Sequence, residues 1–285
     1  MPTVRPMSEA DIPGVYDVMG TAFGDLERRL GSEYLGPPPA LAHSRIRFGR
    51  ALATDPGGSF VAEHDGRVVG CASSIVRDGV WGLSMFVVDP SVQGTGVGRE
   101  LLARCAAYGE GARGRIILAS RDPRAITAYA RMGLRMEPAM SADGMPRGVD
   151  TNDVRPGTPA DLPLTEAVDR AVRGAAHGED ILAMLEADAE LLVAPERGYA
   201  VVLRGAVRLL AAFDDDGAAA VLRGALAHAA AHADAVHVEW LTARQSWAAR
   251  VCVEAGLQLS PTSGPVFTAG DVGPFRPYLP SGSYL

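Results

Sequence analysis

The chain has 285 residues, of which 47% are hydrophobic and 21% charged, enough for one large or two ordinary domains with real hydrophobic cores. All 27 basic residues are arginine, against 34 acidic residues, so the formal net charge is −7. The absence of lysine excludes a P-loop nucleotide site, Schiff-base chemistry and a protein kinase, because each requires a lysine amine. The acidic balance disfavours nucleic acid and anionic membranes as partners.

The cellular compartment is indicated by three features. No apolar run reaches the ~18 residues that a membrane-spanning helix needs, and no apolar stretch follows the N-terminal charge as in a signal peptide. The three cysteines, Cys71, Cys105 and Cys252, are far apart and odd in number, which favours reduced thiols over a disulfide framework. We therefore expect a cytoplasmic protein.

An internal repeat organises the chain. Residues 4–13 recur at 154–163 with an offset of 150, and residues 118–138 recur at 241–261 with an offset of 123. Chance similarity in an Ala-rich chain is disfavoured because the two matches are collinear. The second copy is 27 residues shorter between the matches, about the length of one β-hairpin. We expect two domains, at 1–148 and 149–285.

The first copy predicts alternating helices and strands. In chain order these are helices at 11–23 and 41–53, strands at 58–64, 67–76 and 81–88, a helix at 97–109, a strand at 115–120, a helix at 123–132 and a strand at 134–140. A loop with three prolines separates the first two helices, at 31–39. Asp-Gly pairs at 65–66 and 78–79 predict hairpin turns, so the three central strands form an antiparallel meander. We expect an α/β (α+β) fold, in which each copy is a mixed, mostly antiparallel sheet flanked by helices.

A glycine-rich loop at residues 93–99 joins a predicted strand to a predicted helix. A helix N-terminus presents free N–H groups and partial positive charge, so it can bind phosphate. Glycines let the main chain approach such a ligand closely. A dinucleotide-binding Rossmann site is excluded, because Arg99 stands where its third glycine belongs and the preceding strands are joined by hairpins.

The loop also resembles a known family. Gln93-x-x-Gly96-x-Gly98 is preceded by a Val-x-Pro at 88–90 and followed by two leucines at 101–102, as in the GNAT superfamily of acyl-CoA N-acyltransferases. A second family motif stands at 122–134, in the same order and at the family's spacing. The resemblance covers residues 3–140. It implies an N-acetyltransferase that moves an acetyl (acyl) group from acetyl-CoA to a primary amine of a small molecule by direct attack.

The resemblance also assigns roles to individual residues. The CoA pyrophosphate would be held by the main-chain amides of Gln93, Gly94, Thr95, Gly96, Val97, Gly98 and Arg99, and the pantetheine amides would pair with Phe86, Val87 and Val88. Asp122 replaces the family's Asn, so it can accept a hydrogen bond from the pantetheine arm but cannot donate an amide N–H. Tyr129 would lie near the thioester sulfur and protonate the leaving thiolate. The alternative for Tyr129 is an aromatic residue that only packs on an amphipathic helix.

The general base is not given by a motif. The strand before the loop carries no carboxylate, only Ser84, so a water held by Ser84 or a carboxylate from another element must serve. The chain resembles tandem-domain aminoglycoside acetyltransferases that use their C-terminal carboxylate as base, which makes Leu285 a candidate. The alternative is an aromatic tail, at 275–285, that only docks and joins the two halves.

The acceptor pocket is expected between the early helices and the loop. Acidic and aromatic residues there would select a cationic amine, and arginines would select an anionic one; they are Phe23, Asp25, Glu27, Glu33 and Tyr34, and Arg28, Arg29, Arg45, Arg47 and Arg50. Solvated helix faces explain most of them equally well. The sequence does not choose the acceptor.

The second copy has lost the loop. Residues 213–220 carry three consecutive aspartates there, which would repel a pyrophosphate, and Cys252 stands at the position of Tyr129. We expect this copy to be non-catalytic and to complete the substrate cleft or to mediate a homodimer.

Two clusters of the second copy could in principle bind metal. The aspartates at 214–216 are better explained as a solvated turn. His228 and His232 have i, i+4 spacing, with His237 beyond, but no Glu lies between them, so an exposed face of an Ala-rich helix is favoured and no metal is expected.

Two alternative functions stay open at this stage. Asp122 and the missing strand carboxylate suggest an inactive acyl-CoA-binding sensor or scaffold. The same fold could also support O-acylation or decarboxylation.

Overall fold

The computed structural model describes residues 1–31 and 40–285. The acceptor candidates Glu33 and Tyr34 and the proline loop fall outside these residues. Contacts divide the chain into two compact units, one formed by Met1–Val76 with Trp81–Ala112 and the other by Arg77–Val80 with Arg113–Leu285. Among the described residues, no helix is both long and apolar enough to cross a bilayer.

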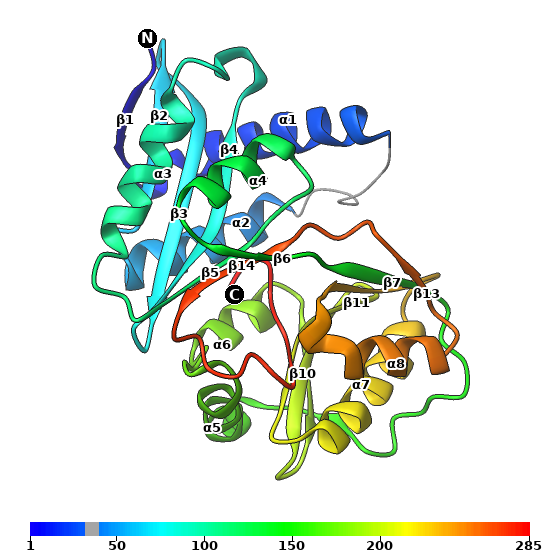
Figure 1. Cartoon of the computed structure of the whole chain (residues 1–285). Coiled ribbons are helices and arrows are strands. Elements are labelled where there is room, and N and C mark those ends of the chain that lie inside the picture. The colour runs from blue at the N-terminus through cyan, green and yellow to red at the C-terminus, as the bar shows by residue number, and fades with distance from the viewer. Residues whose placement is uncertain (32–39) are drawn as a thin grey trace. The chain divides into compact units, whose positions relative to one another are not determined.

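The first unit contains four strands and three long helices (Figure 1). They are β1 (Thr3–Pro6), α1 (Ile12–Leu30), α2 (Leu41–Thr54), β2 (Ser59–His64), β3 (Arg67–Arg77), β4 (Val80–Val88) and α3 (Val97–Tyr108). The strands lie in the order β1-β2-β3-β4, and β2 is antiparallel to both β1 and β3. Both predicted Asp-Gly turns are confirmed, because Asp65, Gly66, Asp78 and Gly79 all have positive φ.

Strand alternation separates the two faces of this sheet. Cys71 belongs to a core cluster with Val61, Met85 and residues of α1 and α2. The neighbouring Gly70 faces Leu101 of α3, whose Cδ1 would lie 3.1 Å from a Cβ at that position. Successive strand residues point to opposite faces, so α1 and α2 cover one face and α3 the other.

The second unit contains the rest of the chain. Its elements are β5 (Gly114–Leu118), α4 (Pro123–Arg131), β6 (Arg135–Glu137), β7 (Met140–Gly144), β8 (Arg155–Pro156), α5 (Leu162–Arg173), α6 (Asp180–Glu186), β9 (Glu190–Ala194), β10 (Gly198–Leu203), β11 (Ala206–Ala212), α7 (Asp215–Ala230), β12 (Val236–Leu241), α8 (Ser246–Glu254), β13 (Gln258–Ser260), β14 (Val266–Gly270) and β15 (Tyr278–Leu279). Helices α7 and α8 pack with one face of β9, β10 and β11 around a large aliphatic core. The opposite face of these strands packs against α5 and α6.

The same local geometry occurs at the start of both copies. An ion pair joins Arg5 Nη2 to Asp11 Oδ1 at 2.7 Å, and its counterpart joins Arg155 Nη2 to Asp161 Oδ1 at 2.6 Å. Each aspartate also accepts a hydrogen bond of 2.8 Å from a main-chain amide three residues earlier. The arginine of the first strand of each copy therefore fixes the start of the following helix.

No hairpin is missing from the second copy, so that expectation is wrong. Strands β9, β10 and β11 take the places of β2, β3 and β4. Most of the shortening lies in two helices and the loop: α5 and α6 have 12 and 7 residues where α1 and α2 have 19 and 14. Two residues separate β11 from α7, where eight separate β4 from α3.

The final strands of the two copies are exchanged. Strand β14, from the second copy, lies between β5 and β6 of the first copy and pairs antiparallel with both (Figure 1). Strand β7, from the first copy, lies between β12 and β13 of the second copy in the order β13-β7-β12-β11-β10-β9-β8. This exchange explains why the compact units differ from the ranges 1–148 and 149–285.

Candidate functional site

The predicted cofactor loop has a fixed main-chain conformation. Gly94 and Gly96 have φ values of 81° and 95°, which non-glycine residues rarely adopt. The Gln93 side chain donates a 2.9 Å hydrogen bond to the Val88 carbonyl, and Thr95 Oγ1 donates one of 2.8 Å to the Val92 carbonyl. Both polar side chains are thus used to hold the loop, so a ligand meets its main-chain amides.

The loop ends at the N-terminus of α3, which no side chain caps. Gly96 is the N-cap residue and has no side chain to accept a hydrogen bond from the first turn. The first N–H groups of a helix lack intrahelical acceptors and carry partial positive charge. The exposed side chains of Arg99 and Glu100 add one positive and one negative charge to this turn. The arrangement can hold an anionic group such as a pyrophosphate with main-chain amides.

Strand β4 places the other predicted cofactor residues beside this turn. A Cβ at Gly98 would lie 3.4 Å from the Phe86 ring and from a Val88 methyl group, so the helix start packs directly on the strand. The predicted cofactor residues Phe86–Val88 and Gln93–Arg99 therefore lie together in the first unit. Asp122 and Tyr129 lie in the second.

Ser84 is buried on β4 and is held by an arginine. Arg47 Nη2, from α2, donates to Ser84 Oγ at 3.0 Å and also to the Ser84 carbonyl oxygen. The Arg47 guanidinium lies over the Phe48 ring at 5.4 Å from its centroid. From the sequence, Arg47 was one of five arginines that could select an anionic acceptor. Its contact with Ser84 distinguishes it from the other four.

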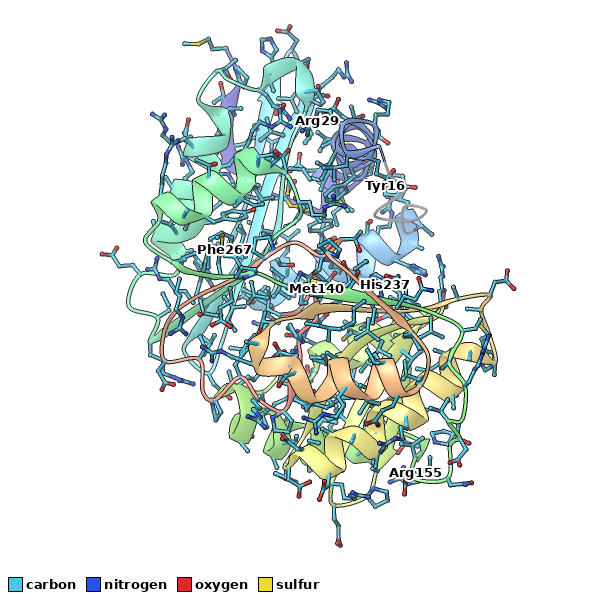
Figure 2. The ribbon with its side chains drawn as sticks, turned by 45° about the vertical axis from the view of Figure 1, so that its right-hand side comes forward. Tyr16, Arg29, Met140, Arg155, His237 and Phe267 are labelled. Atoms are coloured by element: carbon cyan, nitrogen blue, oxygen red, sulfur yellow. The ribbon has the colours of Figure 1, made fainter. Side chains whose placement is uncertain are left out.

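In the second unit, Asp122 and Tyr129 belong to the same helix, α4. Asp122 caps the helix by accepting from Arg124 N at 2.9 Å, and it forms an ion pair with Arg124 Nη2 at 2.7 Å. Tyr129 is 5% exposed and meets Phe267 of β14 edge-on, with ring centroids 5.6 Å apart. Phe267 is labelled in Figure 2. The carboxylate of Asp122 is thus engaged by its own helix.

The tail is docked in the second unit through a buried polar network. The main-chain oxygen of Leu285 accepts a 2.8 Å hydrogen bond from Tyr278 OH and lies 2.9 Å from His177 Nε2. His177 Nδ1 lies 2.9 Å from Asp169 Oδ2, and Tyr199 OH donates to Asp169 Oδ1 at 2.6 Å. Burial raises the pKa of both tyrosines, which keeps their hydroxyl groups protonated as donors.

The second copy closes the helix terminus that the first leaves open. Asp214 Oδ1 caps α7 by accepting from Gly217 N at 2.7 Å, and Asp215 is paired with Arg276. The three aspartates therefore form a helix N-terminal turn, as expected. Cys252, in the place of Tyr129, is fully buried, and burial raises the pKa of its thiol to about 12.

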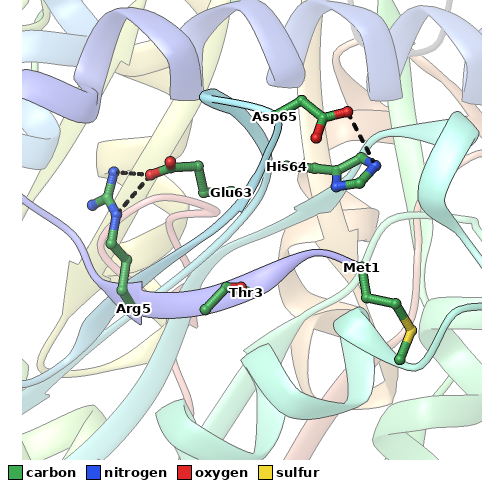
Figure 3. A pocket seen from close by; sticks show the side chains of 6 residues that line it. All are labelled: Met1, Thr3, Arg5, Glu63, His64 and Asp65. Atoms are coloured by element: carbon green, nitrogen blue, oxygen red, sulfur yellow. Dashed lines mark hydrogen bonds and ion pairs between the residues drawn. The ribbon is translucent and has the colours of Figure 1, made fainter.

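A shallow pocket on β1 and β2 is separate from these groups (Figure 3). Its charged residues pair with each other, Arg5 with Glu63 at 2.8 Å and His64 with Asp65 at 3.6 Å. No residue of the predicted site lines it.

The fold and the loop define an α/β protein that offers main-chain amides at a helix N-terminus to an anionic ligand. Residues 25–134 match the model of the acetyltransferase (GNAT) family, so this part of the chain is a GNAT acetyltransferase domain. Among curated proteins, no sequence matches the chain.

Solved structures share the fold over nearly the whole chain. A proposed acetyltransferase from Pyrococcus horikoshii is 16% identical with a TM-score of 0.79, and the match covers 99% of this chain and 95% of that one. A GCN5-related N-acetyltransferase from Sphaerobacter thermophilus is 15% identical with a TM-score of 0.58, covering 99% and 98%. One from Kribbella flavida is 15% identical with a TM-score of 0.55, covering 95% and 72%. At these identities the likeness establishes the fold alone.

Proposed function

We propose that the protein transfers an acetyl group from acetyl-CoA to a primary amine of a small molecule. The observation that carries this proposal is the uncapped N-terminus of α3, reached through Gly94 and Gly96 with positive φ. CoA presents a pyrophosphate, and such a terminus binds phosphate without any lysine. The GNAT domain at residues 25–134 supports the same cofactor.

The proposed reaction is direct transfer. The neutral amine nitrogen attacks the thioester carbonyl carbon, the C–S bond breaks, and the CoA thiolate takes a proton from the Tyr129 phenol. The new amide nitrogen loses a proton to a base. Because the chain has no lysine, none of its side chains offers a primary amine as acceptor.

A water held by Ser84 is the better of the two proposed bases. Ser84 lies on β4, which also carries the predicted cofactor residues Phe86–Val88, and its Oγ accepts from Arg47. The oxygen of Leu285 already accepts a hydrogen bond from Tyr278 OH and lies 2.9 Å from His177 Nε2, and Leu285 is 1% exposed. That oxygen is therefore already engaged by the buried network around Asp169, which makes it the weaker candidate.

The second candidate function is an acyl-CoA-binding sensor without catalysis. It is favoured by the engagement of Asp122 with Arg124 and by the lack of a carboxylate on β4. Thiol release from acetyl-CoA, measured with a panel of cationic, neutral and anionic primary amines, separates the two. Release with at least one amine supports transfer. Binding of CoA without release for any amine supports the sensor, and failure to bind acetyl-CoA contradicts both.

A further inference from the structure

Three potential metal ligands meet in the second copy, away from the groups discussed above. Glu190 begins β9, His228 lies in the last turn of α7, and His232 follows that helix. One ligand atom from each residue lies within 4.8 Å of the other two. Within the described part of the chain, this is the one group of three or more such residues so arranged.

His228 holds a nitrogen that its surroundings do not satisfy. Nε2 lies 3.0 Å from Glu190 Oε2, close enough for an ion pair. This nitrogen is nonetheless buried and makes no hydrogen bond of acceptable geometry to any described residue. A buried polar atom without a hydrogen bond is costly, and a coordinated cation between the nitrogen and the carboxylate would satisfy both.

His232 is oriented by its own helix. Its Nδ1 lies 3.0 Å from the His228 carbonyl oxygen, which can only accept, so Nδ1 carries the proton and Nε2 keeps the lone pair. Metal-binding histidines usually donate their second ring N–H to such a carbonyl. The two imidazole centroids are 5.0 Å apart, although His232 lies just beyond the end of α7.

We propose that Glu190, His228 and His232 form a binding site for a divalent transition-metal ion of the zinc type. Two imidazoles and one carboxylate suit zinc, whereas Mg²⁺ and Ca²⁺ prefer oxygen ligands. Zinc bonds of about 2.0–2.2 Å require only a small inward rotation of the exposed Glu190 and His232 side chains. Three protein ligands leave the fourth position to water.

The site has a structural consequence. A bound ion would tie the end of α7 to the start of β9 and so stabilise the sheet of the second copy. From the sequence, an exposed helix face was expected at the two histidines, because the spacing of residues does not reveal the third ligand of the site. Glu190 comes from another element, 38 residues before His228.

Equilibrium dialysis of the full-length, tag-free chain against ZnCl₂ tests the proposal. The wild type should bind one zinc ion per chain, and His232→Gln and Glu190→Gln should each weaken the affinity at least about 10-fold, since each removes one of three ligands. His64→Gln is the matched control, because His64 is also partly exposed beside a carboxylate, Asp65. Equal zinc binding by wild type and His232→Gln overturns the proposal, as does the absence of zinc binding by wild type.

Thermal unfolding gives a second, independent readout. At free zinc about 100 times the Kd, the wild-type Tm should rise by about 5–10 °C, and His64→Gln should behave alike. His232 is exposed, so His232→Gln should fold and keep its metal-free Tm, but its zinc-dependent rise should disappear. An equal rise in wild type and His232→Gln would overturn the proposal, whichever enzymatic activity the first copy has.

Discussion

Asp214 Oδ1 accepts a 2.7 Å hydrogen bond from the main-chain amide of Gly217 in the first turn of α7. This contact places a carboxylate at the helix terminus that corresponds to the N-terminus of α3. In α3 the N-cap is Gly96, and no side chain occupies that place. One copy is therefore open to a phosphate, whereas the other has already filled its terminus with an anion of its own.

The first prediction concerns the charge at the open terminus. Arg99→Glu should weaken CoA binding by about 10-fold or more, because it replaces a cation near the pyrophosphate with an anion. The same change should stabilise α3 by about 0.3–1 kcal/mol, since anions favour helix N-termini. Isothermal titration with CoA and urea unfolding measure the two effects. Arg250→Glu, at an exposed position of α8, is the control and should leave the Kd unchanged. Equal effects of both substitutions on the Kd would contradict the prediction.

The second prediction concerns the loop conformation. Gly96→Ala introduces a Cβ at φ = 95°, which costs about 1–2 kcal/mol and turns the amides away from the ligand. Gly111→Ala is matched to it, because Gly111 has φ = 83° and equally open space around it. Both variants should lose similar stability in urea, but only Gly96→Ala should raise the Kd for CoA, by about 10-fold. Similar Kd values for the two variants would exclude the loop as the CoA site.

The third prediction concerns the proposed general acid. Tyr129→Phe keeps the ring and its edge-on contact with Phe267 but removes the phenolic proton. We expect kcat to fall about 100-fold or more, with the Kd for CoA changed less than about 2-fold. Steady-state thiol release and CoA titration measure the two constants. Unchanged turnover would mean that Tyr129 only packs.

The fourth prediction concerns the exchanged strand β7. Burial lowers the pKa of His237, but its contacts with Asp143 of β7 and with Glu239 outweigh burial and raise that pKa from 6.5 to about 9. The pKa of the Asp143 carboxyl is lowered: burial raises it, but the hydrogen bond and charge of His237 prevail. A histidine whose pKa is raised on folding stabilises the native state fully below its unfolded pKa, and that contribution is lost as the pH rises through the folded pKa.

Urea unfolding across this pH range tests that pair. The wild-type free energy of unfolding should decline between pH 6.5 and about 9, and His237→Gln should show a smaller decline. His64→Gln should retain the wild-type decline. The same pH dependence in wild type and His237→Gln would contradict the assigned pair.

Local patterns of the sequence were sufficient to predict most elements. The Asp-Gly turns and the glycine loop depend on residues close together in the chain, so their geometry follows from short-range sterics and capping. The strand exchange does not follow from such local patterns. Strands β7 and β14 stand at equivalent places of the two copies, and local propensity cannot decide which sheet each one joins.

The same limit applies to the candidate sites. The loop residues were predictable because they are consecutive. Contacts between distant elements could not be predicted. Examples are the contact of Arg47 with Ser84, 37 residues apart, and the group of Glu190 with the two histidines. The docked tail was expected from its aromatic content, but the partners of Leu285, His177 and Tyr278, depend on tertiary packing.

We propose that the chain holds CoA at the open helix terminus of its first copy and nowhere else. Isothermal titration of the full-length chain with CoA tests it most directly. We predict one CoA per chain, with binding weakened by Gly96→Ala and unaffected by Gly111→Ala. Two CoA molecules per chain, or no measurable binding, would contradict it.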